Sequence, residues 1–305
     1  MLRARRASVA AAGWRRLTEL AHRATSCCVE LSALAVPPAA AALRLRKNAS
    51  LLSAEELDRF RTAMDKFMRR QDNEGYSFFA GWHGIPLGIC KHHEPLFLPW
   101  HRGYLLHFEL ALQRFDPEVT LPWWDWLNEA EIPAAYADET VDGQPNVLAS
   151  AKIRPLGVPP DDDWPTVTHR ESPTEEPRPV PPPLNQFEPE PGLNCEQWVM
   201  AATSYAEASR RIEALHDNIH GWVGGEMGDP TWAGYDPLFW AHHTMVDRLW
   251  RIWQHEHANP PPTGVNLDAA MTFATAPSFA PRELLDVKAR GYDYAGIVSS
   301  GGGTV

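Results

Sequence analysis

Two sets of histidines have the spacing expected of metal ligands. His216 and His220 lie four residues apart, so on a helix both imidazoles leave the same face about one turn from each other. Two neutral imidazoles in that arrangement can hold one side of a metal ion. A third ligand could come from His243, in the next helical stretch. Upstream, a second set of three histidines recurs at intervals of nine residues: His83, His92 and His101.

These imidazole-only sets narrow the choice of metal. No cysteine pair, EF-hand loop or mixed carboxylate–histidine helix motif accompanies them, and imidazole ligands suit copper or zinc better than iron or manganese. A zinc hydrolase would usually keep a carboxylate near the ligands as general base, a role that Glu207 or Asp217 could take. A zinc hydrolase or structural zinc protein is therefore one alternative. Two facing three-histidine centres with room for dioxygen between them are the other.

Four segments with helical periodicity could position these ligands. Ser53-Ala-Glu-Glu56 fits a capping box and begins a helix that ends near Arg70. The pattern predicts three more helices, His101 to about Phe115, Tyr205 to about Trp222, and about His242 to His257. Four such helices, paired as two antiparallel hairpins, can carry metal ligands in a bundle core. With few strand signals, the sequence predicts a mainly α fold, a four-helix bundle with long irregular loops.

Composition divides the chain into unequal parts. Residues 1–42 are rich in Arg and Ala and nearly free of acid, so we expect a loosely held N-terminal extension, with an amphipathic targeting helix as the alternative. The main domain is predicted over 43–296. It contains an insertion at about 138–194 that is rich in Pro and acidic residues and is expected to be irregular. Residues 297–305 are expected to form a flexible tail.

The charge and hydropathy of the chain exclude some partners and locations. A formal net charge of -11 argues against nucleic acid and anionic membrane surfaces, which both require a basic face. No run of about 18 apolar residues is present that could span a membrane. Arg15, Arg16 and Glu19 interrupt the apolar stretch that a secretory signal needs, so a cytoplasmic location is favoured. The sequence does not indicate an oligomeric state.

Longer motifs around the histidines point to a family. Cys90-Lys-His-His-Glu-Pro-Leu-Phe-Leu-Pro-Trp-His-Arg102 resembles the first copper motif of the type-3 copper proteins, which are tyrosinases, catechol oxidases and haemocyanins. Two later segments together resemble the second copper motif of the same proteins. They are His216-Asp-Asn-Ile-His-Gly-Trp-Val-Gly-Gly225 and Asp236-Pro-Leu-Phe-Trp-Ala-His-His-Thr-Met-Val-Asp-Arg-Leu-Trp250. The resemblance spans roughly residues 43–294.

The resemblance implies a dinuclear copper centre with dioxygen as co-substrate. By position, His83, His92 and His101 would bind the first copper ion. The second would be bound by His216, His220 and His243. His93 and His242 are the neighbours to be weighed against these ligands.

The implied activity is oxidation of small phenolic substrates, o-diphenols, to o-quinones, and in tyrosinases also hydroxylation of monophenols. A copper-delivery protein is a candidate partner. The alternatives are haemocyanin-like dioxygen binding and oxidation of o-aminophenols. A compact chain of 305 residues favours the enzyme over a carrier built from larger subunits.

Further residues match family positions by their spacing. Cys90, two residues before His92, stands where many members form a thioether to the ligand imidazole. Phe239 matches an aromatic residue that packs over the site. Glu207, nine residues before His216, matches a glutamate that holds the water which deprotonates a monophenol, and a second candidate for that role is Glu213.

One family position departs from the tyrosinase pattern. Tyrosinases often carry Asn directly after the first ligand of the second copper, where this chain has Asp217. An ionised carboxylate accepts hydrogen bonds but cannot offer an amide donor. We therefore expect oxidation of diphenols rather than hydroxylation of monophenols.

Two more matches are structural. Arg102 and Asp247 resemble a pair that orients the ligand helices. Tyr292-Asp-Tyr294 resembles a Tyr-x-Tyr signature that stacks near an arginine such as Arg46 and ties the end of the domain to its start.

Overall fold

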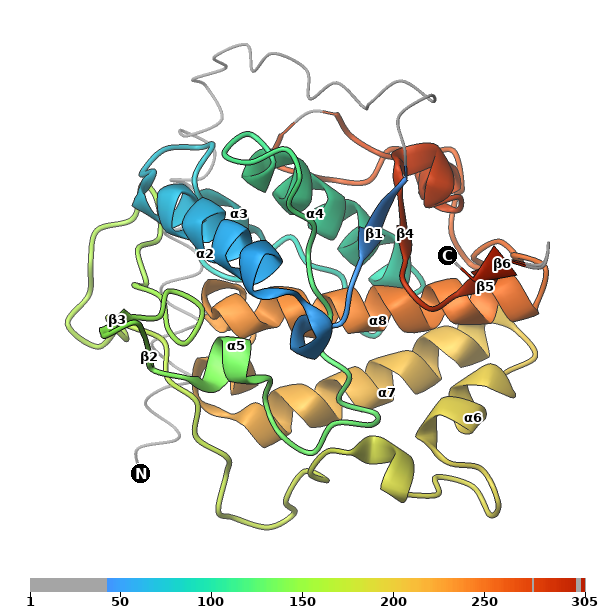
Figure 1. The fold of residues 1–305 in the computed structure, drawn as a ribbon. Coiled ribbons are helices and arrows are strands. Elements are labelled where there is room, and N and C mark those ends of the chain that lie inside the picture. Colours follow the sequence, from blue (N-terminus) through green and yellow to red (C-terminus); the bar gives the residue numbers. More distant parts are fainter. Residues whose placement is uncertain (1–42, 276, 300–302, 305) are drawn as a thin grey trace.

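Four long helices form the core of the structure, a computed structural model that describes residues 43–275, 277–299 and 303–304. In Figure 1, α8 crosses the middle of the molecule, with α7 along one side and α4 on the other, and α2 lies beside α4. The mainly helical prediction is confirmed. The predicted extension, residues 1–42, lies outside the described residues. The four helices are α2 (Ala54–Arg69), α4 (Phe97–Leu112), α7 (Tyr205–Val223) and α8 (Pro237–Glu256).

Two of the core helices begin earlier than predicted. α8 begins at Pro237, where Asp236 accepts a hydrogen bond from the backbone N–H of Leu238 (2.8 Å). Proline suits the first turn because its missing N–H would have had no partner there. α4 begins at Phe97 and not at His101. In consequence, both His101 and His243 lie inside helices, where packing holds their backbone.

Two shorter helices were not predicted. α3 (Tyr76–His83) falls in a stretch expected to be loop, and seven of its eight residues are buried. A helix buried on almost every side has no polar stripe, so its sequence shows no amphipathic period. α6 (Cys195–Met200) follows the insertion and begins with a capping box between Asn194 and Gln197.

The other elements are short and lie in the connections. A four-residue helix, α5 (Ala134–Ala137), stands near the start of the insertion. The 3-10 turns are η1 (Ala49–Leu51), η2 (Leu184–Gln186), η3 (Gly225–Gly228), η4 (Ala233–Tyr235), η5 (Pro281–Leu284) and η6 (Lys288–Arg290). Two antiparallel pairs join β2 (Thr140–Val141) to β3 (Gln144–Pro145) and β5 (Val298–Ser299) to β6 (Gly303–Thr304). The last pair lies in the segment predicted as a flexible tail.

The start and end of the domain pair as two parallel strands. β1 (Arg44–Arg46) lies beside β4 (Tyr292–Tyr294), with Arg46 opposite Tyr294 (Figure 1). The Arg46 guanidinium stands 3.8 Å above the centre of the Tyr292 ring, a cation–π geometry. The expected contact between the Tyr-x-Tyr segment and this arginine is therefore present.

A buried network of charges connects this strand pair to the helices. The side chains of Arg46 and Arg102 are 0% and 1% exposed, and those of Glu109 and Asp247 are 4% and 2% exposed. Arg46 donates to both carboxylates, Arg102 donates to Asp247, and Tyr294 donates its hydroxyl to Asp247 (2.5 Å). Two positive and two negative groups balance, which is what burial of ions requires.

The insertion at 138–194 is irregular but fastened to the helical core. Arg170 holds Asp236, the cap of α8, through two bonds of 2.9 and 2.6 Å. The side chain of Asn218 in α7 both donates to and accepts from the backbone of Val180, at 2.7 Å each. These contacts join the insertion to the two helices that carry the second histidine set.

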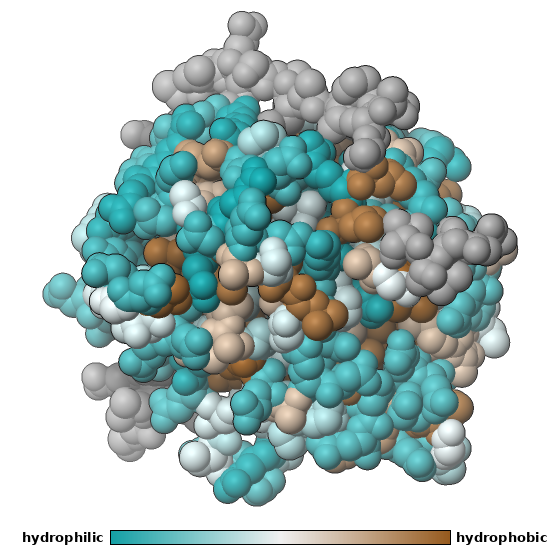
Figure 2. Space-filling view, in the orientation of Figure 1, coloured by the Kyte–Doolittle hydropathy of each residue, from teal (hydrophilic) through white to brown (hydrophobic). Residues whose placement is uncertain are grey.

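The exterior is mainly polar. Figure 2 shows a face on which hydrophilic residues predominate and hydrophobic ones form small separate areas. Among the helices that the structure describes, none has the length and apolar character needed to cross a membrane.

Candidate metal centre

The fold brings the six predicted histidines together from five segments. His83 is the last residue of α3, His92 lies in the loop before α4, and His101 lies in α4. α7 contributes His216 and His220, and α8 contributes His243. Two contacts join the sets. The rings of His101 and His243 stack with centroids 4.6 Å apart, and those of His92 and His216 with centroids 5.6 Å apart.

The second set converges on one point. The Nε2 atom of His243 lies 3.3 Å from Nε2 of His216 and 3.2 Å from Nε2 of His220. Imidazole nitrogens that share a tetrahedral metal ion at about 2.0–2.1 Å are separated by roughly 3.3–3.4 Å. Nε2 of His243 therefore lies at about the separation from each of the other two nitrogens that a shared cation needs.

The first set is more open: His83 and His101 each have a ring nitrogen within 4.8 Å of one in His243, and His92 has one within 4.8 Å of His83. The ring of His92 lies 5.0 Å from the rings of both His83 and His101, centroid to centroid. The Nε2 atoms of His83 and His101 are buried and have no hydrogen-bond partner among the described residues. A buried nitrogen without a hydrogen-bond partner destabilises the folded state unless a ligand binds it, so the set fits a metal ion.

Hydrogen bonds on the outer side of the rings define their tautomers. A backbone carbonyl can only accept, so each Nδ1 that meets one carries the proton, and the lone pair is left on the inward Nε2. This outer support is typical of histidines that bind metals. The pairs are His83 with Pro230 O (3.0 Å), His101 with Phe97 O (2.8 Å) and His220 with Met227 O (2.7 Å). In the same way, Nδ1 of His216 donates to Oδ1 of Asp217 (2.9 Å).

Burial keeps the cluster neutral. Removal from water, helped by the neighbouring histidines, lowers the pKa of His92 to about 4, and burial lowers the pKa of His220 to about 4. The same two causes hold the pKa values of His83, His101, His216 and His243 well below the ordinary value. Neutral imidazoles are the form that binds metal.

The two neighbouring histidines lie differently. His93 turns outward, with a side chain that is 75% exposed. His242 is buried against the ring of His216 (centroids 5.1 Å apart), and neither of its ring nitrogens has a partner among the described residues. It lies within the same cluster. The short Nε2 contacts are nonetheless made by His243, which favours that residue as the ligand.

Two further predicted residues adjoin the cluster. The Sγ atom of Cys90 and the ring nitrogens of His83 and His92 lie within 4.8 Å of one another. Burial raises the pKa of the Cys90 thiol to about 11, so without a metal ion this sulfur keeps its proton. The ring of Phe239 is buried with its centroid 4.1 Å from that of His243, so it packs against the cluster.

A thioether between Cys90 and His92 stays a prediction. We expect protein matured with copper to have an intact mass lower by two hydrogens, and Cys90 to resist alkylation after unfolding. The Cys90→Ser variant is the control and should have its full calculated mass. Ready alkylation of Cys90 in copper-matured protein would contradict the bond.

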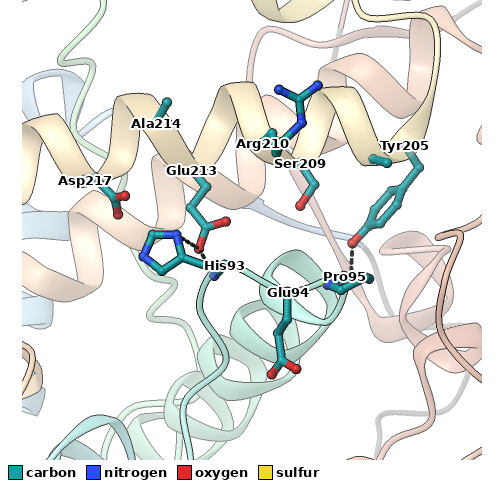
Figure 3. A pocket seen from close by; sticks show the side chains of 10 residues that line it. His93, Glu94, Pro95, Tyr205, Ser209, Arg210, Glu213, Ala214 and Asp217 are labelled. Carbon is teal, nitrogen blue, oxygen red and sulfur yellow. Dashed lines mark hydrogen bonds and ion pairs between the residues drawn. The ribbon is translucent and has the colours of Figure 1, made fainter.

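A pocket opens beside the cluster, between α7 and the loop before α4 (Figure 3). Its volume is about 430 Å³. None of the six histidines is in its lining, but it is linked to them through His93, which follows His92 in the chain, and through Asp217, which is bonded to His216. The residues that line it are His93, Glu94, Pro95, Tyr205, Ala206, Ser209, Arg210, Glu213, Ala214 and Asp217.

Glu207 does not reach this pocket. Nine residues turn a helix by about two and a half turns and advance it by about 13 Å, so Glu207 and His216 lie on opposite faces of α7. The Glu207 carboxylate instead binds Arg211 (2.7 Å) and the backbone N–H of Thr203 (2.9 Å). The structure therefore does not support the water-holding role predicted from its spacing.

The other acids of α7 do line the pocket. Glu213 is three residues from His216 and Asp217 one, and both are in the lining. Burial raises the pKa of each carboxyl above its ordinary value. The period of the helix favours Glu213 over Glu207, a signal that sequence reasoning could have used. The hydroxyl groups of Tyr205 and Ser209 in the lining were not predicted from sequence.

Comparisons with known proteins agree with this site. The common central domain of tyrosinase matches residues 73–256. The chain is 30% identical over 238 residues to the A-type hemocyanin, units Ode to Odg, of Enteroctopus dofleini, covering 71% of this chain but only 18% of that protein. It is 30% identical over 244 residues to a tyrosinase of Streptomyces glaucescens, covering 70% of this chain and 84% of that protein. A functional unit of octopus hemocyanin has a similar structure, with a TM-score of 0.67 at 26% identity, covering 82% of this chain and 67% of that one.

Proposed function

Because the chain belongs to the tyrosinase family of type-3 copper proteins, we propose that it is a dicopper oxidase that converts o-diphenols to o-quinones. Two diphenols give up four electrons and four protons, which reduce one dioxygen to two waters. One observation carries the proposal. Six buried or half-buried imidazoles cluster in the core, four of them with outward hydrogen bonds from Nδ1, and a pocket of about 430 Å³ with room for a phenolic ring is linked to them through His93 and Asp217.

Each set of three histidines would hold one copper ion, and the copper pair supplies the redox chemistry with dioxygen. The residues of the chain position the ligands and shape the site. The carbonyls of Pro230, Phe97 and Met227 hold the rings of the ligand histidines in place. Asp217 accepts a hydrogen bond from Nδ1–H of His216, which makes that imidazole more basic. Phe239 closes the site from the core side.

Asp217 also bears on the choice between diphenols and monophenols. Its Oδ1 is engaged by His216, and a carboxylate has no N–H with which to hold a second group. Glu207, the other half of the expected water-holding pair, faces away from the pocket. These two observations favour diphenol oxidation over monophenol hydroxylation.

Dioxygen binding without turnover is the second candidate, favoured by the 30% identity to an octopus hemocyanin. A carrier must admit dioxygen but needs no pocket for an organic molecule. The pocket between α7 and the loop before α4 therefore supports the oxidase.

Spectroscopy and oxygen uptake on copper-loaded protein test the proposal together. We expect a near-ultraviolet band when peroxide is added, rapid oxygen uptake with catechol, and uptake at least about tenfold slower with tyrosine, a difference of roughly 1.4 kcal/mol in activation free energy. The band together with reversible oxygenation and no loss of catechol would indicate the carrier. Binding of zinc but not copper would indicate the zinc alternatives.

A further inference from the structure

The pocket is lined by the Glu213 carboxylate, one oxygen of which has no hydrogen-bond partner among the described residues. The Glu213 side chain is 6% exposed and lines the pocket. Its Oε1 accepts the backbone N–H of His93 (2.6 Å) and lies 3.8 Å from Nδ1 of that histidine. Among the described residues, nothing donates a hydrogen bond to Oε2. Figure 3 shows the carboxylate on the pocket side of α7, facing the loop before α4.

The charges around this oxygen are mostly negative. Asp217 follows Glu213 by four residues, so the two carboxylates lie on one face of α7, and both point to the pocket side (Figure 3). Of the positive groups nearby, the Arg210 guanidinium is directed away from His93. The His93 imidazole is 75% exposed and meets only Oε1. Glu94, the third acid in the lining, is paired with Lys91 (3.4 Å).

A cation in the pocket would stabilise this arrangement. A carboxylate held out of water loses hydration, and a second carboxylate one turn away adds repulsion. A positive group placed between them would offset both effects, with a direct bond to the free Oε2. An anionic group in the same place would add a third negative charge.

The spacing between Glu213 and His216 along α7 suits a substrate with an aromatic ring and a short side chain. Glu213 precedes His216 by three residues, a rise of about 4.5 Å along α7. An aromatic ring against His216 would therefore bring a substituent on a two-carbon chain to the level of Glu213. The remainder of the pocket wall near this point is small or hydroxylic: Ala206, Ser209 and Ala214.

We propose that Glu213 is the specificity residue of this pocket, and that with Asp217 it selects o-diphenols whose side chain carries an ammonium group. This inference rests on the proposed function, because it assigns the substrate class of the same site. The ring would face the histidines and the ammonium group would bind Oε2 of Glu213.

Three diphenols that differ in side-chain charge test the inference. Dopamine is cationic, 4-methylcatechol is neutral and 3-(3,4-dihydroxyphenyl)propionate is anionic. For the copper-loaded protein we expect kcat/KM for dopamine to exceed that for the propionate by about tenfold or more, the effect of one favourable ion pair shielded from water. The neutral diphenol should fall between them. Equal or reversed values would overturn the inference.

The Glu213→Gln variant separates charge from structure. Glutamine keeps an oxygen that can accept the His93 N–H but removes the negative charge. We expect the ratio of kcat/KM for dopamine to kcat/KM for the propionate to fall by about tenfold, whatever the change in kcat/KM for the neutral 4-methylcatechol. An unchanged ratio in this variant would contradict the role of Glu213.

Glu226 provides a matched control. It is equally buried at 6% exposure and accepts the N–H of an exposed histidine, His169, at the same distance of 2.6 Å, but it does not line the pocket. Glu226→Gln should leave the ratio of kcat/KM for dopamine to kcat/KM for the propionate unchanged. An equal fall of the ratio in both variants would attribute the effect to a general loss of buried charge and overturn the inference.

Failure of the proposed function gives a different result. If 4-methylcatechol is not oxidised, the oxidase proposal fails, and charge selection is then measured by calorimetric binding to the copper-loaded protein. Tyramine should bind about tenfold more tightly than 3-(4-hydroxyphenyl)propionate in the wild type, and Glu213→Gln should remove the difference. Equal affinities in the wild type would overturn the charge selection.

Discussion

The His243→Ala variant is expected to lose copper from the second site and to lower the rate of diphenol oxidation by at least about a hundredfold. Loss of a residue that only supports a metal ligand already lowers affinity or activity by up to about a hundredfold, so loss of a ligand should cost at least as much. His243 makes the short Nε2 contacts with His216 and His220, and its ring also stacks on His101 of the first set. The measurements are the ratio of copper to protein after dialysis and the rate of oxygen uptake.

His242→Ala tests the assignment from the other side. His242 is the adjacent residue, equally buried, and its ring nitrogens are unpaired among the described residues. Its nitrogens do not make the short contacts that His243 makes, so this variant should keep two copper ions per chain. Loss of copper in His242→Ala with retention in His243→Ala would exchange the two roles.

Removal of the charge of Asp247 is expected to be the most damaging change to stability. Asp247→Asn leaves Arg46 and Arg102 buried with only one carboxylate, Glu109, to balance them. An uncompensated buried charge costs about 3–5 kcal/mol, which should lower the melting temperature by on the order of 10 °C in a domain of this size. Thermal unfolding of the wild type and the variant under identical metal content measures it.

An exposed aspartate–arginine pair gives the control for this variant. Asp268 binds Arg282 through two bonds, as Asp247 binds its partners, but their side chains are 70% and 58% exposed. Water and salt screen such pairs, so Asp268→Asn should leave the melting temperature nearly unchanged. A similar loss in both variants would show that burial of the network is not the cause.

The stability conferred by Asp247 should also depend on pH. Burial opposes ionisation of this carboxyl, but Arg102 and Arg46 outweigh burial, and the pKa of Asp247 lies below its ordinary value. The unfolded chain then binds the proton more readily than the folded one, so this stability is complete above the unfolded pKa of about 3.9 and is lost as the pH falls through the folded pKa. Urea unfolding should show a smaller difference between wild type and Asp247→Asn at pH 3 than at pH 6.

Short-range patterns accounted for much of the fold. The capping box at Ser53 and Glu56 is present, with both of its hydrogen bonds. The interval of four residues between His216 and His220 places their rings side by side on α7. These features depend on neighbours within one helical turn, so their physics is contained in a few consecutive residues. The start of α8 also depends on neighbouring residues only, because Asp236 caps the helix and Pro237 is in its first turn. The predicted start near His242 did not take these two residues into account.

Other features depend on packing between distant segments. α3 has no periodic pattern because nearly every side of it is covered by other parts of the chain. Adjacent residues on a helix point in directions that differ by about 100°, so the packing of α8 against α7 brings His243, and not His242, into the short contacts with His216 and His220.

The helical class and the family could be predicted from the sequence, because they follow from residue types and spacing within short motifs. The acids that face the site could not be predicted, because they depend on how the segments pack. Glu207 had the spacing of a family residue, yet the turn of α7 directs it to Arg211, while Glu213 and Asp217 line the pocket beside the histidines. A pocket is formed by segments that meet across the fold, here α7 and the loop before α4, so its charge cannot be derived from either segment alone.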